Sequence, residues 1–511
     1  MDKIFYVTTP IYYVNGKPHI GHAYTTILCD TFARYHRFRG EKVFFLTGTD
    51  EHGGKIEKTA RAEGKEAKEY VDAIVSSFKD LWRDLDITHD DFIRTTEDRH
   101  KRVVAGILEN LLRKGDIYRG KYKGWYCVPC ESFWKDSELA GGNCPDCNRA
   151  VQELEEENFF FKLSTYQDWL VSYIQEHPDF IFPEVRRNEI LAFLENPLED
   201  LCISRPKSRL AWGIPFPGEP DHVVYVWFDA LINYVSAIGF GESPDFGRFW
   251  PADIQFLAKD ILRQHTVYWP IMLRAMGLEP PRRVLSHGWW TIEGTKISKS
   301  RGNRVDPAEI ITKYGVDAFR YFLLREVTMG SDGTYSEELL QGRFRNDLGN
   351  DLGNLVHRSF GMLGKYFGEK IPPVENPSQI ENGLKTEGLL LFGKVEAAMQ
   401  ALDVRLALEE IWSFVRRANR FVEETKPWVL AKDSSRGGEL SEMMYTLMES
   451  IRICGVILIS FLPQTGRKIL RELCLPEAAS AGALKRWGAL RPGEKVGKSE
   501  PLFPRIETED A

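Results

Sequence analysis

The fold is decided at the start of the chain by residues 4–22, IFYVTTPIYYVNGKPHIGH. The stretch 4–9 is β-branched and aromatic and ends at a proline, which is typical of a strand. A helix is predicted from about 21 to 39, with Gly40 as its terminating residue, and 43–47 is predicted to be a second buried strand. Strand, polar loop, helix and parallel strand form a βαβ unit. The sequence therefore predicts a doubly wound, Rossmann-like α/β domain of the nucleotide-binding type.

The predicted sheet is interrupted by an insertion and followed by a helical region. Apolar residues recur at helical spacing from 70 to 85, and strands at 223–227, 254–258 and 283–286 are expected to resume the sheet. Beyond 325 the pattern is almost entirely helical, which predicts an all-α helix bundle. The predicted domains are the first half of the sheet domain at 1–115, an inserted connective domain at 116–225, the second half of the sheet domain at 226–292, a region with a lysine-rich loop at 293–345, the helix-bundle domain at 346–487 and a C-terminal tail at 488–511.

The tail is rich in glycine and proline. Leu502 and Phe503 stand between two prolines near its end. Exposed apolar residues in such a segment favour a strap that docks back on the protein, and a mobile tail is the alternative.

Composition is that of a soluble globular protein, with 43% hydrophobic and 28% charged residues among 511. No run approaches the ~18 apolar residues of a membrane span, and the first residues resemble a strand more than a signal peptide. A cytoplasmic location is therefore expected. The net charge of −7 argues against non-specific binding of nucleic acid, although a local basic surface can still recognise a polyanion.

Four of the eight cysteines form two Cys-x2-Cys pairs separated by 13 residues, Cys127 with Cys130 and Cys144 with Cys147. This spacing predicts a zinc knuckle, and four thiolates would close the tetrahedron, so the metal is expected to be structural. Two surface disulfides are the alternative. The remaining cysteines are expected to fill apolar cores: Cys29, Cys202, Cys454 and Cys474.

Two basic segments far apart in the chain are predicted to form one ATP site. In the first, PHIGH at 18–22, His19 and His22 lie where a helix begins, and their N–H groups can bind phosphate oxygens. In the second, KISKS at 296–300, two flexible lysines can close on a triphosphate and stabilise the leaving pyrophosphate. The alternatives are a capped surface loop with incidental histidines and a solvated lysine–serine loop.

Together these segments resemble the paired signatures of the class I aminoacyl-tRNA synthetases. Further likeness to the methionyl-tRNA synthetase family, of the bacterial type with a single zinc knuckle, extends over residues 4–303. Ile297 departs from the methionine usual in the second motif, and this apolar exchange is not expected to matter. The stretches that carry the further likeness are IYYVNG at 11–16, TGTDEHG at 47–53, VWFDA at 226–230 and KDILRQH at 259–265.

The resemblance implies a methionine–tRNA ligase with one structural Zn²⁺, which uses Mg²⁺ with ATP to form methionyl-adenylate and transfers methionine to the terminal ribose of tRNA(Met). The implied catalytic residues are His19, His22, Lys296 and Lys299. The implied ATP contacts are Gly21, Asp260, Lys296, Ser298, Lys299 and Ser300. The implied methionine pocket is Ile11, Tyr13, Asp50, Trp227, Ala230, Tyr234, Ile261 and His265, and the implied anticodon contacts are Asn354, Arg358 and Trp428.

The residue types suit these roles. The Asp50 carboxylate, after a buried strand, can bind the substrate ammonium group, and aromatic faces with one or two polar tips suit a weakly accepting thioether. Asn and Arg can bond to base edges, and an exposed Trp can stack on a base. The alternatives are a helix N-cap for Asp260, core packing for the pocket aromatics and a buried ring for Trp428.

Two other functions stay open at this stage. The first is a class I synthetase for another amino acid, although leucine, valine or isoleucine enzymes would need a larger editing insertion. The second is a non-catalytic, zinc-containing RNA-binding protein on a synthetase scaffold, which would not need both ATP motifs intact. The expected partners are tRNA, ATP and methionine, without DNA or a membrane, and a monomer is expected because no dimerisation appendage follows the helix bundle.

Overall fold

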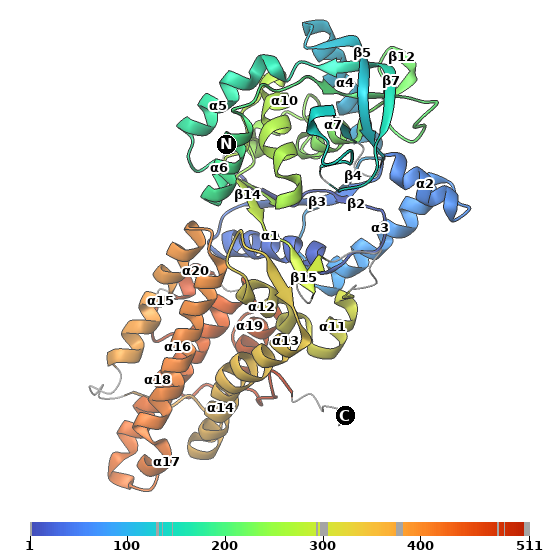
Figure 1. Cartoon of the computed structure of the whole chain (residues 1–511). Coiled ribbons are helices and arrows are strands. Elements are labelled where there is room, and N and C mark those ends of the chain that lie inside the picture. The colour runs from blue at the N-terminus through green and yellow to red at the C-terminus, as the bar shows by residue number, and fades with distance from the viewer. Residues whose placement is uncertain are drawn as a thin grey trace. The chain divides into compact units, whose positions relative to one another are not determined.

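The chain forms two compact units (Figure 1), each described by itself. The first unit is Met1–Pro18, Val43–Arg83 and His89–His287, and the second is His19–Lys42, Asp84–Thr88 and Gly288–Ala511. The computed structural model describes residues 3–128, 132–134, 136–145, 147–292, 295–296, 305–374, 382–477, 480–484 and 486–504. Among these residues no helix is long and apolar enough to cross a bilayer.

A seven-stranded parallel sheet is the centre of the first unit. Its strands run in the order β2-β3-β1-β13-β14-β8, with β4 on the other side of β3. The strands predicted at 4–9, 43–47, 254–258 and 283–286 are therefore confirmed. Because all strands are parallel, their carboxyl ends meet at one edge, where such sheets bind ligands. The bounds are β1 Phe5–Thr8, β2 Tyr12–Tyr13, β3 Val43–Asp50, β4 Asp91–Arg94, β8 Ile181–Phe182, β13 Ile254–Ala258 and β14 Val284–His287.

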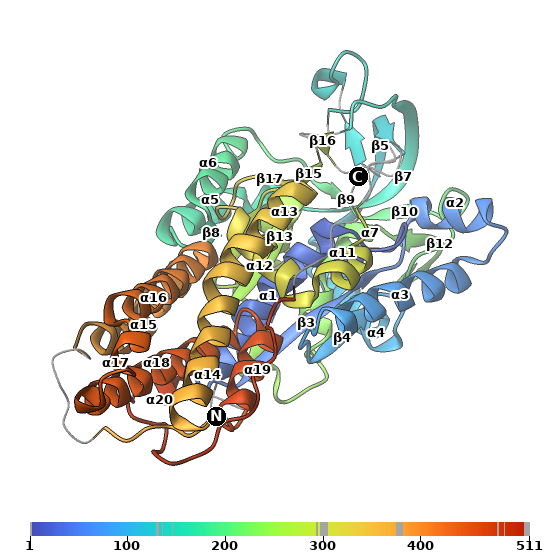
Figure 2. The ribbon, with the colours of Figure 1, turned by 90° about the horizontal axis from the view of Figure 1, so that it is seen from below.

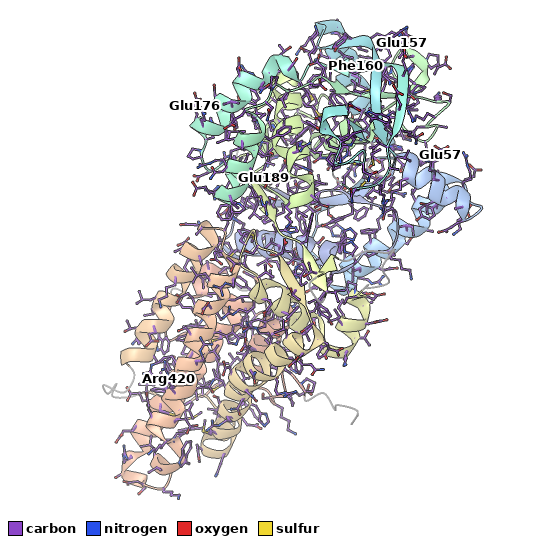
Figure 3. The ribbon with its side chains drawn as sticks, viewed as in Figure 1. Glu57, Glu157, Phe160, Glu176, Glu189 and Arg420 are labelled. Carbon is purple, nitrogen blue, oxygen red and sulfur yellow. The ribbon has the colours of Figure 1, made fainter. Side chains whose placement is uncertain are left out.

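Most helices of this unit bury an apolar side. In α3, the predicted amphipathic helix, the buried residues include Val71, Val75 and Phe78 at helical spacing. Exposed acidic side chains such as Glu157 and Glu176 lie at the periphery (Figure 3). The helices are α2 Gly54–Ala62, α3 Ala67–Asp84, α4 Asp98–Lys114, α5 Gln167–Glu176, α6 Glu184–Phe193, α7 Val226–Leu231, α8 Asn233–Ser236, α9 Phe246–Phe249 and α10 Trp269–Met276, with a 3-10 turn at Lys259–Ile261 and a π-helical turn at Gln264–Tyr268.

Two small antiparallel sheets occupy the predicted insertion, and β5 and β7 of the first lie side by side in Figure 1. One sheet has the order β6-β5-β7-β9 and the other β10-β12-β11. The bounds are β5 Ile117–Cys127, β6 Ser132–Trp134, β7 Gln152–Phe161, β9 Leu201–Cys202, β10 Ser204–Pro206, β11 Pro215–Phe216 and β12 Glu219–Val224.

One strand prediction is wrong. Residues 223–227 do not resume the parallel sheet, because β12 pairs antiparallel with β10 and β11, and α7 begins at Val226. A short apolar run has the same sequence pattern in a buried parallel strand, a small antiparallel sheet or a buried helix, so periodicity could not distinguish them. The strand that does join the main sheet from within the insertion is β8, which is only two residues long.

The second unit is mainly helical, and α15, α16 and α18 run alongside one another in both views (Figures 1 and 2). It also holds α1, whose predicted end is confirmed, since Gly40 follows the C-cap with φ 87°. A small sheet has the order β16-β15-β17. The bounds are α1 Ile20–Phe38, β15 Trp290–Ile292, β16 Thr295–Lys296, α11 Pro307–Tyr314, α12 Val316–Glu326, β17 Gly333–Tyr335, α13 Glu337–Arg343, a π-helical stretch Phe344–Gly353, α14 Asn354–Phe367, α15 Asn382–Gln400, α16 Val404–Thr425, α17 Pro427–Leu430, α18 Gly437–Leu458, α19 Pro463–Glu472 and α20 Ala481–Leu484.

The described part of the tail docks on the helical region, as the sequence favoured. The ring of Phe503 lies 6.0 Å from that of Phe344, and Lys468 Nζ donates to the backbone oxygen of Pro501 at 3.0 Å. Further back, the Tyr445 hydroxyl donates to a tail carbonyl, that of Leu490, at 2.9 Å. The strap interpretation is therefore confirmed for the tail residues up to 504.

Candidate functional site

The predicted histidine pair lies at the start of α1, in the second unit. His19 is the N-cap residue, and its Nδ1 atom accepts a hydrogen bond from the backbone N–H of Gly21 at 3.1 Å. The Nδ1 atom of His22 accepts one from the backbone N–H of His19 at 3.2 Å. The two rings stack with their centroids 3.8 Å apart. The pair thus caps the helix on which it is predicted to bind phosphate.

The capping bonds determine where each neutral imidazole carries its proton. An Nδ1 atom that accepts a hydrogen bond has no proton, so each ring is the Nε2–H tautomer. Each histidine therefore has an N–H donor at a helix start, where the helix dipole also favours anions. A Cβ atom on Gly21 would lie 3.0 Å from Cε1 of His19, so the glycine leaves room for the His19 ring.

The second predicted phosphate segment is only partly described. The backbone of Lys296 forms the end of β16, which pairs with β15. The side chain of Lys296 and the residues Ser298, Lys299 and Ser300 lie outside the described residues. Their role in binding ATP stays a prediction.

Asp50 ends β3 at the carboxyl edge of the sheet, in the first unit. It is buried, and Tyr13 pairs with it in the parallel register of β2 and β3. Ile11 lies next to the same strand. A Cβ atom on Gly48 would come 2.0 Å from the carbonyl oxygen of Ile93 and 3.0 Å from Cγ2 of Ile11, so only glycine fits there. The fold therefore brings three of the predicted methionine residues together.

The other five methionine residues lie on α7, α8 and the turns after β13. The Tyr234 hydroxyl and the Nε2 atom of His265 are 2.8 Å apart, and Nδ1 of His265 lies 2.9 Å from the carbonyl oxygen of Ile261. The ring of Trp227 stands edge-on to His265 with centroids 6.4 Å apart, and Ala230 is buried on the same helix as Trp227. These residues form a second group.

Burial keeps His265 neutral. A carbonyl can only accept, so Nδ1 of His265 donates to Ile261, and Nε2 accepts from the Tyr234 hydroxyl. Burial lowers the pKa of His265 from 6.5 to about 4, against smaller raising effects of the Ile261 carbonyl and Asp260. At neutral pH the wall made by Trp227, Tyr234 and His265 is therefore aromatic and uncharged.

This neutral histidine predicts a pH dependence of stability. In the unfolded chain the pKa of His265 returns to 6.5, so between about pH 6.5 and pH 4 the unfolded state binds more protons. The stability contributed by the neutral ring is complete above pH 6.5 and is lost as the pH falls toward 4. We expect the wild type to lose about 2 kcal/mol more than His265→Gln between about pH 7.5 and pH 5, measured by urea unfolding. Equal losses in both proteins would contradict this assignment.

Asp260 follows β13 at the same sheet edge. It lies inside the 3-10 turn, is exposed, and the N-cap position belongs to Ala258 without a side-chain cap bond. The N-cap interpretation of Asp260 is therefore wrong. Since Ile11 follows β1, Asp50 ends β3 and Asp260 follows β13, the parallel topology places all three at one edge.

Several polar residues within the quoted motifs were not assigned a role from sequence. Glu51 is fully buried and accepts two hydrogen bonds from Arg94, at 2.6 and 2.9 Å. His52 and His100 both bond to the buried carboxylate of Asp229. Glu51 and His52 follow Asp50 directly, and Asp229 lies two residues after Trp227, so their place in the motifs is a signal that could have found them. His100 lies outside the quoted motifs and had no such signal.

Three of the four knuckle cysteines are described and gather closely. The Sγ atoms of Cys127, Cys144 and Cys147 all lie within 4.8 Å of one another, and those of Cys127 and Cys147 are 3.5 Å apart. Tetrahedral zinc–thiolate bonds of about 2.3 Å require sulfur atoms about 3.8 Å apart, so the three sulfurs fit a metal. The 3.5 Å between the Cys127 and Cys147 sulfurs is much longer than the ~2.05 Å of a disulfide bond. Cys130 lies outside the described residues.

The other cysteines were expected to fill apolar cores. Cys29, Cys202 and Cys454 are buried, as expected. Cys474 is exposed, so the expectation is wrong for it; it follows the end of α19, in a left-handed conformation with φ 55°.

The predicted anticodon residues lie on the helical region of the second unit. Asn354 and Arg358 are one turn apart on α14; Asn354 is exposed, and Arg358 Nη2 lies 2.9 Å from Glu423 Oε1. Trp428 lies on α17 with 38% of its surface exposed, beside the exposed Val429. The interpretation of Trp428 as a buried ring is therefore wrong.

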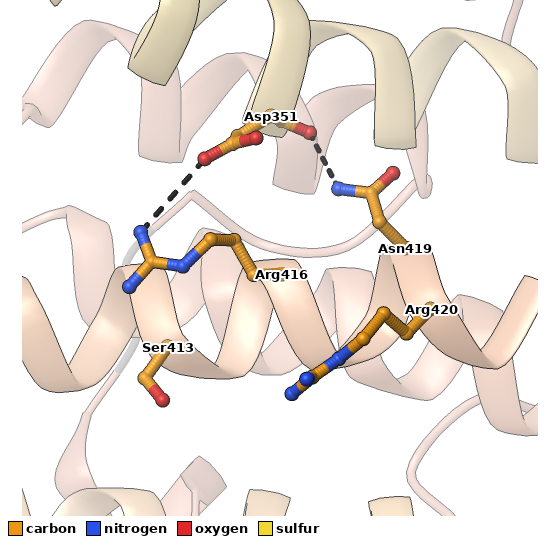
Figure 4. A pocket seen from close by; sticks show the side chains of 5 residues that line it. All are labelled: Asp351, Ser413, Arg416, Asn419 and Arg420. Carbon is orange, nitrogen blue, oxygen red and sulfur yellow. Dashed lines mark hydrogen bonds and ion pairs between the residues drawn. The ribbon is translucent and has the colours of Figure 1, made fainter.

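A basic pocket of about 330 Å³ lies between α16 and the π-helical stretch Phe344–Gly353, lined by Asp351, Ser413, Arg416, Asn419 and Arg420 (Figure 4). Asn419 donates to the backbone oxygen of Asp351 at 2.9 Å, and Arg416 lies 3.9 Å from its carboxylate. Burial raises the pKa of Asp351, while Arg416 lowers it. Two guanidinium groups against one carboxylate leave the pocket with a positive charge.

Comparison with known proteins places the chain among synthetases. A family model described as "tRNA synthetases class I (M)" matches residues 5–156 and 149–360, and one described as "Anticodon binding domain of methionyl tRNA ligase" matches 371–511. A methionine–tRNA ligase of Caldanaerobacter subterraneus subsp. tengcongensis is 50% identical over 511 residues, which cover 100% of this chain and 80% of the relative. That of Thermotoga maritima is 44% identical over 511 residues, 99% of this chain and 81% of the relative.

Solved structures agree. Mycobacterium tuberculosis methionyl-tRNA synthetase in complex with methionyl-adenylate has a TM-score of 0.94 and 39% identity, over 98% of this chain and 100% of that one. The free-state structure of the same enzyme has a TM-score of 0.88 and 36% identity, over 99% of each chain.

Proposed function

Because this chain belongs to the methionyl-tRNA synthetases, a branch of the class I synthetases, we propose that it is a methionine–tRNA ligase that joins methionine to tRNA(Met) with ATP. The relatives are 44% identical or more over essentially its whole length. That identity argues against the two alternatives, a synthetase for another amino acid and a non-catalytic RNA-binding protein. The solved neighbour that contains methionyl-adenylate supports the chemistry of the first step.

The observation that carries the substrate assignment is the uncharged aromatic wall of Trp227, Tyr234 and His265. A thioether is apolar, polarizable and a weak hydrogen-bond acceptor, so contact with aromatic faces stabilises its binding. The uncharged polar atoms of Tyr234 and His265 do not oppose that binding. Asp50, in the same unit, supplies the carboxylate that an α-ammonium group needs. Ile11, Tyr13, Ala230 and Ile261 are proposed to complete the pocket.

The proposed reaction needs no covalent nucleophile from the protein. A carboxylate oxygen of methionine attacks the α-phosphorus of ATP, the bond to the bridging oxygen breaks, and pyrophosphate leaves with its electron pair. The Nε2–H groups of His19 and His22 are proposed to stabilise the charge on the α-phosphate, and Lys296 and Lys299 the leaving pyrophosphate. Gly21, Asp260, Ser298 and Ser300 are proposed ATP contacts, and Mg²⁺ is proposed to enter with ATP. In the second step the 2′-hydroxyl of the terminal tRNA ribose displaces AMP.

An amino-acid-dependent ATP–pyrophosphate exchange assay with each of the twenty amino acids tests this function. Exchange with methionine alone, followed by charging of tRNA(Met), is the expected result. Exchange with a different amino acid, or none with any, would refute the proposal.

Zinc is proposed to bind Cys127, Cys130, Cys144 and Cys147 and to stabilise the small cluster around Trp134, which has few apolar residues of its own. Cys144→Ser is expected to remove stoichiometric zinc and to expose the cluster, measured by metal analysis and by hydrogen exchange of β5. Cys202→Ser, at a buried cysteine outside the knuckle, is the matched control and should keep the metal. Unchanged zinc content in Cys144→Ser would refute the ligand set.

Anticodon recognition is proposed for Asn354, Arg358 and Trp428, supported by the exposed Trp428 ring and by the positive pocket on neighbouring helices. Stacking on an aromatic side chain is worth ~1–3 kcal/mol for each base, so Trp428→Ala should reduce the kcat/KM of tRNA charging by about 10- to 100-fold. Pyrophosphate exchange should not change, because it requires no tRNA. Val429→Ala, at the exposed neighbouring residue, is the control. Equal losses in charging and exchange would contradict the assignment.

A further inference from the structure

A buried carboxylate, Asp229, joins two histidines from distant parts of the first unit. Its Oδ2 atom lies 2.6 Å from Nδ1 of His52, and its Oδ1 atom lies 2.6 Å from Nε2 of His100. Nδ1 of His100 in turn lies 2.8 Å from the hydroxyl of Ser236. Asp229 and His100 are fully buried and His52 nearly so. These four residues are called the Asp229 network below.

The carboxylate of this network is ionised. Burial by itself would raise the pKa of Asp229, but His52 and His100 outweigh it and hold the pKa below its usual range. An ionised carboxylate only accepts, so Nδ1 of His52 and Nε2 of His100 both donate to it. Charge-assisted bonds of this length in a dry interior are strong and directional, and losing one partner leaves a buried charge partly unsatisfied.

The network connects the two groups of proposed methionine residues. Asp229 lies between Trp227 and Ala230 on α7, and His52 lies two residues after Asp50 at the end of β3. The bond between Asp229 and His52 therefore sets the distance between the Asp50 carboxylate and the aromatic wall of the proposed pocket. His100, from α4, holds the other oxygen and so determines the orientation of the carboxylate.

The position of helix α7 depends on the bonds from His52 and His100 to Asp229. It is six residues long, and its N-cap, Tyr225, makes no side-chain cap bond. A helix this short is unstable alone, so tertiary contacts must determine its position. The turn that it meets is itself held rigidly, because Glu51 is bonded to Arg94 and the indole of Trp212 donates to the carbonyl oxygen of Glu51. Because the turn after Asp50 is rigid and α7 is not stable by itself, the bond between His52 and Asp229 determines the width of the proposed methionine pocket.

We propose that Asp229, His52 and His100 are positioning residues that determine methionine affinity by fixing α7 against the turn after Asp50. This inference rests on the proposed function, since it needs the residues of α7 and Asp50 to bind methionine. The three residues are not proposed to touch the reacting atoms. Their removal should therefore change the KM for methionine and leave the KM for ATP unchanged.

The test uses pairs of variants at each histidine. An asparagine amide nitrogen can occupy the place of histidine Nδ1, and a glutamine amide nitrogen that of Nε2, so His52→Asn and His100→Gln keep the donor that each alanine variant removes. In pyrophosphate exchange with the full-length protein, His52→Ala should raise the KM for methionine by about 10- to 100-fold, with the KM for ATP within about twofold. His52→Asn should recover most of the loss, and His100→Ala and His100→Gln should show the same difference.

His222→Ala is the matched control. His222 is a buried histidine of the same unit, on β12, whose Nε2 bonds to the backbone oxygen of Glu157 in β7 and not to a residue of α7. It should lower the melting temperature without raising the KM for methionine. If His222→Ala raises that KM as much as His52→Ala does, or if His52→Asn is no better than His52→Ala, the positioning role is refuted.

Failure of this inference can be distinguished from failure of the proposed function. If the wild type shows no methionine-dependent exchange, the function itself is wrong. If the wild type is active and His52→Ala changes both KM values equally, only the inference is wrong. If the alanine variants do not fold, His52→Asn and His52→Gln are compared instead. His52→Asn keeps the donor nitrogen in place and His52→Gln misplaces it. Only His52→Gln should then raise the KM for methionine.

Discussion

His22→Ala should slow methionine-dependent pyrophosphate exchange by about 10²- to 10³-fold, the effect expected from the loss of one preorganised donor to a developing charge. The Nε2–H tautomer of His22 follows from its capping bond to the His19 N–H, so the donor is in place before ATP binds. The proposed contacts of methionine are Asp50 and the aromatic wall, not His22, so the dissociation constant of methionine should stay within about twofold. Rapid-quench measurement of adenylate formation and calorimetric binding of methionine check the two halves of this expectation.

The capping role of His22 needs its own control. His22→Asn keeps an acceptor near the position of Nδ1 and so preserves the cap, but it lacks the Nε2–H donor. It should be as slow as His22→Ala and melt closer to the wild type. Recovery of the rate in His22→Asn would show that the helix cap, and not the donor, is what the reaction needs.

The second large effect is expected at Asp50. Asp50→Asn should raise the dissociation constant of methionine by about 10²- to 10³-fold, because removing one partner of a buried ion pair costs ~3–5 kcal/mol. The fold should tolerate the change, since Asp50 ends its strand at the sheet edge and the pairing of β3 uses only its backbone. Calorimetric titration with methionine is the direct measurement.

Asp91, on the neighbouring strand, is the control for the effect of Asp50→Asn on methionine affinity. Asp91, at the start of β4, pairs with Arg99 and lies at the opposite end of the sheet strands from the carboxyl edge. Asp91→Asn should leave methionine affinity within about twofold. If Asp50→Asn binds methionine as tightly as the wild type, Asp50 is not the residue that binds the ammonium group.

Structural elements that are determined by residues close together in the chain could be predicted from the sequence. The extent of α1 follows from its apolar residues and from Gly40, whose φ of 87° suits a glycine, and β13 follows from its run of apolar residues. The spacing of Cys127, Cys144 and Cys147 predicted that their thiols would gather. Each of these depends on residues close together in the chain, so periodicity, end signals and ligand spacing are enough.

Non-local features could not be predicted in the same way. Residues 223–227 have the composition of a sheet strand, yet β12 pairs outside the main sheet and α7 begins at Val226, because partners distant in sequence determine which arrangement buries the apolar side chains. The neutral state of His265 depends on burial by segments that assemble only in the fold.

The sequence by itself determined the family, the parallel sheet, the helical C-terminal region and the residue types of the site, since these depend on local pattern and motif. Only the tertiary structure decided that His52 and His100 meet on Asp229, that His265 is uncharged and that the Trp428 ring is exposed. The physical reason is that burial and long-range hydrogen bonds depend on which distant segments pack together, and that packing exists only in the folded chain.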